Sequence, residues 1–129
     1  MTGVQTCALP ICHQAGDQVL VGIAICISDA VRRAGDCPSR YGGEEFAVLL
    51  PGLSNMEAFR VAETIRLKVE HWSEDPVSTV SIGVASMMPV ASLDWSDLVE
   101  AADKALYAAK GNGRNQSVLA SLPQLARVA

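Results

Sequence analysis

The chain has 129 residues, of which 50% are apolar and 19% are charged, and its formal net charge is −4. This length and composition fit one globular domain with its own core and exclude an intrinsically disordered chain. An acidic protein is a poor candidate for broad binding to a nucleic-acid backbone, so we expect no DNA or RNA partner. No apolar run approaches the length of a membrane span. We expect a cytoplasmic protein, although a longer parent could be anchored to a membrane through upstream domains.

The four cysteines are Cys7, Cys12, Cys26 and Cys37. No two of them form a C-x-x-C pair, and the two histidines lie far apart in the sequence, so a zinc site is not expected. We interpret them as reduced thiols, with Cys26 in the core.

Residues 1–12 differ from the rest of the chain because they carry no charge and no clear hydrophobic period. They do not form a convincing signal peptide, since there is no basic start and Pro10 interrupts the apolar stretch. The run from Met1 to Ile11 resembles a translated sequencing-adapter string, of the kind found at the ends of fragmentary predicted genes. A disordered leader is the alternative interpretation.

A helical pattern extends from Ala15 to Arg33, with apolar residues at three- and four-residue steps. Gly35 fits the end of this helix. A short strand at 38–41, the pair Gly42-Gly43 and a return strand at 45–50 then predict a hairpin, because a tight primed turn needs positive φ. The apolar residues of the helix are Val19, Leu20, Ile23, Ala24, Ile27 and Val31.

Ser54 and Glu57 form an S-x-x-E capping box, which predicts the start of a second helix that residues 73–76 end. Alternation over 79–84 predicts a half-buried strand. The residues expected to face inward are Phe59, Ala62, Ile65, Val69 and Trp72 in the helix, and Val80, Ile82 and Val84 in the strand.

After a loop at 87–93, a third helix is predicted to start at Asp94 or Ser96 and to stop at 111–113. Its inward residues are Leu98, Ala102, Ala105, Leu106 and Ala109. Residues 116–120 are predicted to form a last edge strand. The order helix, hairpin, helix, strand, helix, strand predicts an α/β sandwich with a mixed, largely antiparallel sheet and helices packed on it.

The hairpin also carries the chemistry. Gly42 and Gly43 let a ligand approach the backbone closely, and their N–H groups can face an anion. Glu44 and Glu45 add two carboxylates, which are natural ligands of Mg²⁺, a cation that usually also holds substrate phosphates. The same four residues occur in plain surface hairpins, so by themselves they leave both interpretations open.

The run Arg-Tyr-Gly-Gly-Glu-Glu-Phe at 40–46, with Leu50-Pro51 just after it, resembles the signature of the GGDEF domain family in its GGEEF form. Three further stretches, 13–20, 79–84 and 102–115, agree with the family in order and spacing. The resemblance covers residues 13–119, and it leaves 1–12 as a non-family leader and 120–129 as a tail.

This resemblance implies a diguanylate cyclase of bacterial signalling, which condenses two GTP into cyclic di-GMP and pyrophosphate with Mg²⁺ or Mn²⁺. Each domain would hold one GTP, so catalysis would need a homodimer. Glu44 would be a metal ligand, and Glu45 would be a second metal ligand or would help to activate the 3′-hydroxyl. Gly42 and Gly43 would let the nucleotide lie across the hairpin.

Asp17 would accept hydrogen bonds from the guanine edge, and Lys110 and Arg114 would hold the terminal phosphates. Arg33 and Asp36 resemble the RxxD product-inhibition site of the family. Each group also has a structural interpretation: a first-turn or capping acid for Asp17, a basic last turn for Lys110 and Arg114, and a helix-ending turn for Arg33 and Asp36.

The chain departs from the family pattern in two places. The family domain starts with a strand that carries D-x-D-x-F-K and then an Asn that contacts guanine, and residues 1–12 hold neither pattern. Thr64 stands where a further arginine often completes the inhibition site. We therefore expect an N-terminally truncated domain whose sheet lacks its first strand, with weak or no cyclase activity. The alternative is a catalytically inactive module that binds GTP or cyclic di-GMP as a sensor.

Overall fold

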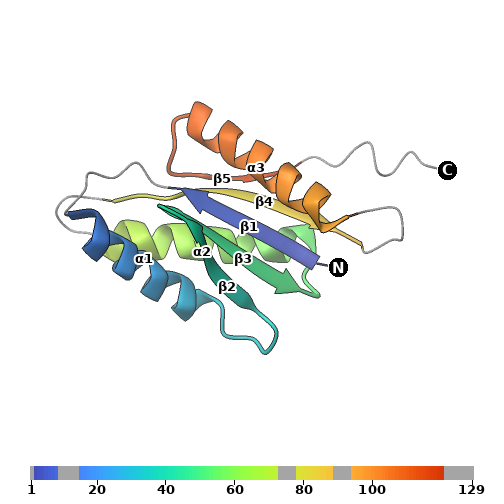
Figure 1. The fold of residues 1–129 in the computed structure, drawn as a ribbon, viewed down its shortest axis with the longest axis horizontal. Coiled ribbons are helices and arrows are strands. Elements are labelled where there is room, and N and C mark those ends of the chain that lie inside the picture. The colour runs from blue at the N-terminus through green and yellow to red at the C-terminus, as the bar shows by residue number, and fades with distance from the viewer. Residues whose placement is uncertain (1, 9–14, 73–77, 89–93, 121–129) are drawn as a thin grey trace.

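The structure is a computed structural model that describes residues 2–8, 15–72, 78–88 and 94–120. One sheet with the strand order β2-β3-β1-β4-β5 forms the centre of the molecule. Helices α1 and α2 cover one of its faces and α3 covers the other (Figure 1). The elements are β1 Thr2–Ala8, α1 Ala15–Ala30, β2 Cys37–Gly42, β3 Glu45–Pro51, α2 Asn55–Trp72, β4 Ser81–Met87, α3 Trp95–Gly111 and β5 Ser117–Leu119. Among the strands of the described residues, only β4 and β5 pair in parallel, so the predicted mixed, largely antiparallel sheet is confirmed.

Strand β1 shows that the expectation of a sheet without its first strand was wrong. It lies between β3 and β4 and pairs antiparallel with both, so that Ala8 stands opposite Glu45 on one side and Ser81 on the other. The physical reason is that β3 and β4 both present backbone N–H and C=O groups, which an extended segment satisfies whatever its side chains. The sequence TGVQTCA gives no clear alternation that could have predicted this strand.

Helix α1 ends at Ala30, three residues before the predicted end, and a turn with Gly35 at φ 94° follows it. Its inner side contributes Ile23 and Ile27 to the main core, as the periodicity predicted, and Cys26, which was expected there as a reduced thiol. Burial of Cys26 raises the pKa of its thiol, which keeps this cysteine protonated and inert.

The hairpin is confirmed, but its turn is shifted by one residue from the prediction. Gly42 pairs with Glu45, so the two residues at the tip are Gly43 and Glu44. Gly43 has φ 47°, a left-handed value that glycine adopts without steric cost. The shift arises because the register slips between Arg40 and Gly42, which leaves one residue of β2 without a partner.

The capping box of α2 is confirmed by both of its hydrogen bonds, from Ser54 N–H to Glu57 Oε2 at 2.7 Å and from Glu57 N–H to Ser54 Oγ at 3.3 Å. Helix α2 buries Ala62, Ile65 and Val69. Trp72 was expected to face inward, but it is 46% exposed and its ring lies over Gly22 of α1. The predicted break at 73–76 lies outside the described residues.

Strand β4 was expected to be half-buried, yet both of its faces are covered from Ser81 to Ser86. Val80, Ile82 and Val84 join the core under α1 and α2, whereas Ala85 packs with Leu98 and Ala102 of α3. All five predicted inward residues of α3 are buried. The predicted loop at 87–93 begins one residue later, since Met87 belongs to β4, and 89–93 lie outside the described residues.

Strand β5 takes the predicted position at the edge of the sheet. Within the described ranges, no helix is long and apolar enough to cross a bilayer. Of the expected tail, only Ala120 is described, and its N–H donates to Val84 O.

Candidate nucleotide site

The candidate site residues gather at one end of the sheet. In the strand register, Glu45 stands opposite Ala8, Ala8 opposite Ser81, and Ser117 is paired with the next residue of β4. The tip of the β2–β3 hairpin, the start of α1 and the end of α3 all lie at this end, on the left of Figure 1. The fold therefore brings three segments that are distant in the sequence to one edge.

A cavity of about 430 Å³ opens between α1 and the hairpin. Asp17 lines it from the first turn of α1, and Arg40 lines it from β2. Its walls are mostly apolar, and they include Leu20, Ala24 and Phe46. A flat heterocycle would find apolar walls here and one carboxylate able to accept hydrogen bonds from ring or exocyclic N–H groups.

A second cavity, of about 280 Å³, lies on the opposite face of the hairpin, towards α3. Glu45 lines it together with Trp95 and Asp103 of α3. Burial against these apolar walls raises the pKa of the Asp103 carboxyl. Asp17 and Glu45 thus line two different cavities, which the hairpin separates.

The hairpin tip itself is open. A Cβ atom built on Gly42 or Gly43 would meet no other atom within 4 Å. A ligand could therefore lie across the backbone of these two residues. Arg40 stiffens this tip, because its Nε donates to Gly43 O at 2.8 Å. Glu44 is half-buried at the tip, and Glu45 begins β3.

Lys110 and Arg114 were expected at the end of the third helix. In the structure only Lys110 belongs to that helix, and the two residues have different backbone conformations. Lys110 lies in the last turn of α3, whereas Arg114 lies beyond its end at φ 65°. Neither makes an ion pair with any residue that the structure describes. A hydrogen bond from Ile82 N–H to Gln116 O, at 3.0 Å, fixes their loop to the start of β4.

The carboxylates suit a cation that is shared with a ligand. Among the described residues there is no group of three or more His, Cys, Asp or Glu that could hold a metal ion alone. Glu44 and Glu45 provide two carboxylates at the tip, and β1 adds no acidic residue beside them. Mg²⁺ is commonly held by one or two carboxylates together with substrate phosphates. The residues present therefore fit a phosphate-bridged cation rather than a closed protein cage.

Arg33 and Asp36 form a closed turn rather than an open pair. Arg33 Nη2 contacts Asp36 Oδ1 at 2.7 Å and also donates to Pro51 O at 2.9 Å. The side chain of Asp36 is 3% exposed and that of Arg33 is 47% exposed. Since Pro51 ends β3, this turn lies the length of that strand, about 20 Å, from Glu45. The pair is thus remote from the hairpin tip.

Sequence reasoning assigned no role to Arg40 or Ser39, yet both line the cavity of Asp17. The available signal was their position on β2, two and three residues before the Gly-Gly pair, although successive residues of a strand are expected to face opposite sides. The bulge beside Tyr41 hides that alternation. Counting every second residue back from the turn therefore does not predict which residues of β2 line this cavity.

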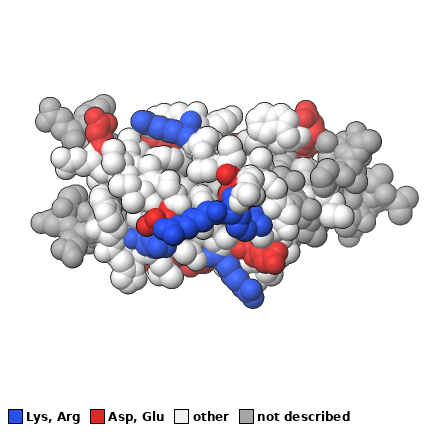
Figure 2. All heavy atoms as spheres, turned by 90° about the horizontal axis from the view of Figure 1, so that it is seen from below, with Lys and Arg blue, Asp and Glu red and all other residues white. Residues whose placement is uncertain are grey.

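One face of the domain carries charges of both signs. On the face seen in Figure 2, Lys and Arg side chains lie next to Asp and Glu side chains, and much of the surface carries neither. Recognition of a nucleic-acid backbone needs a basic stripe. The site thus has the features of one for a small nucleotide: an apolar cavity, an acid at its wall, and two basic residues at the same end of the sheet that form no ion pair within the described part of the chain.

The chain belongs to the GGDEF domain family, because the family described as "Diguanylate cyclase, GGDEF domain" matches residues 11–116. This match agrees with the resemblance found at 40–46.

Among similar proteins, Diguanylate cyclase A of Treponema denticola is 45% identical over 115 residues, which is 83% of this chain and 30% of that protein. The GGDEF domain of DgcB from Caulobacter crescentus, solved with c-di-GMP, is 30% identical with a TM-score of 0.81, covering 92% of this chain and 77% of that one. An active GGEEF domain of a diguanylate cyclase from Vibrio cholerae is 26% identical with a TM-score of 0.83, covering 93% and 83%. The chain spans less than a third of the curated relatives that it matches.

Proposed function

We propose that this domain condenses two GTP molecules into cyclic di-GMP and pyrophosphate. The observation that carries the proposal is the open hairpin tip, where Glu44 and Glu45 stand at the end of the sheet that also receives Asp17 and the Lys110–Arg114 loop. Family membership supports the same reaction, and the similar domain from Caulobacter crescentus was solved with its product.

In this reaction Asp17 would bind the N–H edge of guanine in the apolar cavity beside α1. Lys110 and Arg114 would hold the β- and γ-phosphates, and Gly42 and Gly43 would let the sugar and α-phosphate lie across the tip. Glu45 would orient the 3′-hydroxyl or the cation that faces it. Positioning and charge neutralisation, rather than covalent chemistry by the protein, would carry the step.

A divalent cation, Mg²⁺ or Mn²⁺, would neutralise charge on the α-phosphate and lower the pKa of the attacking hydroxyl. Glu44 and Glu45 would hold it together with phosphate oxygens. A homodimer is part of the proposal, because one bound GTP cannot close the two-fold ring of the product. Sedimentation of the chain with and without GTP would measure this association.

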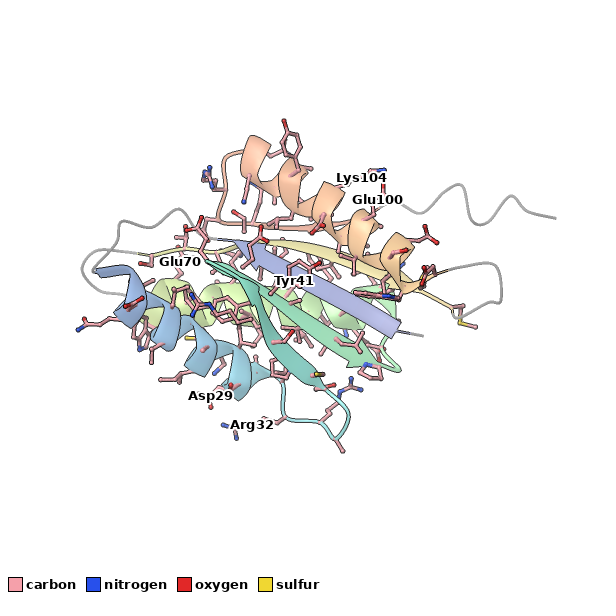
Figure 3. All side chains as sticks on the ribbon, in the orientation of Figure 1. Asp29, Arg32, Tyr41, Glu70, Glu100 and Lys104 are labelled. Carbon is pink, nitrogen blue, oxygen red and sulfur yellow. The ribbon has the colours of Figure 1, made fainter. Side chains whose placement is uncertain are left out.

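The test is formation of cyclic di-GMP by the purified chain with GTP and Mg²⁺. We expect slow turnover that Glu45→Gln abolishes. Glu100→Gln is the matched control, since Glu100 is an exposed carboxylate paired with Lys104 on the outside of α3 (Figure 3). Turnover that survives Glu45→Gln would contradict the assignment of this residue.

The absence of acidic residues from β1 favours a second candidate function, a sensor that binds nucleotide without turnover. Ala8→Asp would add a carboxylate at the position that the register sets opposite Glu45. If the domain is a cyclase limited by its metal site, Ala8→Asp should raise the rate. If it is a sensor, calorimetry should detect cyclic di-GMP binding in the unmodified chain, and neither chain should turn GTP over.

We also propose product binding at the turn of Arg33 and Asp36. Arg33 is half-exposed. The hydrogen bonds from Ser54 are the main cause that lowers the pKa of Glu57, and the charges of Arg33 and Arg60 lower it further, so two cations lie near this carboxylate. Thr64 contributes no cation there, and its hydroxyl donates to Arg60 O at 2.9 Å. Weak cyclic di-GMP binding that Arg33→Ala removes would support the site, and unchanged binding would refute it.

A further inference from the structure

The loop after α3 adopts an unusual backbone conformation. Gly113, Arg114 and Asn115 have φ values of 113°, 65° and 45° in succession. Two of these are not glycine, and L-residues with a Cβ atom avoid the left-handed region because of steric clash. Such residues persist only where the surrounding structure fixes them. Since Arg114 is one of them, its direction depends on whatever holds this loop.

Local hydrogen bonds supply part of the support. Arg114 N–H donates to Ala109 O at 2.9 Å, which closes the loop on the last turn of α3. The side chain of Gln116 donates to Asn112 O at 3.0 Å and to Arg114 O at 3.2 Å. These three bonds join residues of the same segment, whereas the backbone bond from Ile82 N–H to Gln116 O, at 3.0 Å, holds the far end of the segment to β4.

One side-chain contact ties the loop to a different element. Arg66 of α2 donates from Nη1 to Asn115 Oδ1 at 3.1 Å, across 49 positions in the sequence. Its guanidinium is itself fixed, because it contacts Glu63 at 2.9 Å and Glu70 at 3.1 Å, and its side chain is 16% exposed. Figure 3 shows Glu70 towards the end of the sheet where α3 ends. A planar fork held by two carboxylates is a rigid donor for a third partner.

We propose that Arg66 is a positioning residue for the phosphate-binding loop. By holding Asn115 in its left-handed conformation, it keeps Arg114 directed at the triphosphate and so sets the affinity for that part of the nucleotide. The inference rests on the proposed function in one respect, namely that Arg114 binds phosphate. The contact between α2 and the loop stands independently of that function.

Three variants separate this role from a general loss of structure. Arg66→Met removes the donors and keeps most of the apolar stem. Asn115→Gly keeps the positive φ without steric cost, removes the acceptor and leaves both ion pairs of Arg66 intact. The double variant tests whether the two residues act through one contact. Arg32→Met is the matched control, since Arg32, just beyond the end of α1, makes the same i,i+3 pair with Asp29 of that helix, at 2.8 Å (Figure 3).

The first measurement is an NMR titration with two probes, the α,β-methylene analogue of GTP with Mg²⁺ and guanosine, which has no phosphate. We expect each single variant to weaken analogue binding about tenfold and to leave guanosine binding unchanged, as loss of a charge-assisted hydrogen bond would. The double variant should be no weaker than either single variant. Equal weakening of both probes, or full affinity in Asn115→Gly, would overturn the proposal.

The second measurement is amide hydrogen exchange of Arg114 without ligand. Its N–H is bonded to Ala109 O, and we expect its protection to fall about tenfold in Asn115→Gly and Arg66→Met but not in Arg32→Met. Unchanged protection would refute the positioning role. If the unmodified chain binds the analogue no better than guanosine, the proposal that Arg114 binds phosphate is wrong. The exchange measurement still tests whether Arg66 holds the loop, because it needs no ligand.

Discussion

Replacing Gly83 by alanine should separate α3 from the sheet. A Cβ atom at Gly83 would stand well inside 3.0 Å of both Ala102 O and Leu106 N, and 3.0 Å from Leu106 Cα. Real Cβ atoms essentially never come within 3.0 Å of another group. These neighbours are backbone atoms of α3, so no side-chain rotation can relieve the clash, and the whole helix has to move away from β4.

The cost follows from this geometry. Overpacking in a well-packed core costs about 1–3 kcal/mol, and a clash with backbone belongs at or above the upper end of that range. With a urea m-value of about 2 kcal/mol/M for a domain of this size, a loss of ~3 kcal/mol lowers the unfolding midpoint by about 1.5 M. Because Lys110 lies in the last turn of α3, the GTP binding proposed above should weaken as well.

Urea unfolding followed by circular dichroism measures the effect, with two other glycines for comparison. Gly111→Ala should leave the midpoint unchanged or raise it slightly, since its Cβ would meet nothing within 4 Å. Gly22→Ala should cost less than Gly83→Ala, because only the half-exposed ring of Trp72 has to move. A midpoint for Gly83→Ala within 0.3 M of the unmodified chain, about 0.6 kcal/mol, would refute the close approach of α3 to β4.

Three further predictions concern stability. The hydrogen bond from Arg66 holds the pKa of Glu63 below its ordinary 4.5, so the free energy of unfolding should decrease as the pH falls below 4.5. Urea midpoints measured across pH should show a smaller decrease in Arg66→Met. Burial raises the pKa of Asp103 above 3.8, so the charged carboxylate destabilises the fold at neutral pH. Asp103→Asn should therefore stabilise the fold by less than about 1 kcal/mol at pH 7 and not at all well below pH 3.8. A gain in stability that is independent of pH would contradict this. Ser54→Ala should cost about 1 kcal/mol in thermal unfolding through loss of the cap to Glu57, and an unchanged midpoint would exclude that role.

Local rules predicted the helices and the hairpin well. The cap at Ser54 and Glu57 and the apolar spacing in α3 depend only on residues three or four apart, so the sequence carries them in full. The exact tip of the hairpin was missed because the irregularity beside Tyr41 depends on how β2 registers with β3. The burial of both faces of β4 was missed because it depends on where α3 packs.

The candidate site divides in the same way. The sequence by itself determined the family, the two hairpin carboxylates and the basic residues near the end of α3, because these are residue types at fixed spacings. Tertiary structure decided that β1 fills the centre of the sheet, since that position is defined by unpaired backbone groups on two other strands and not by the side chains of TGVQTCA. It also decided that Asp17 and Glu45 line different cavities, and that Arg66 reaches Asn115 from another helix, because only the folded chain brings α2 beside the end of α3.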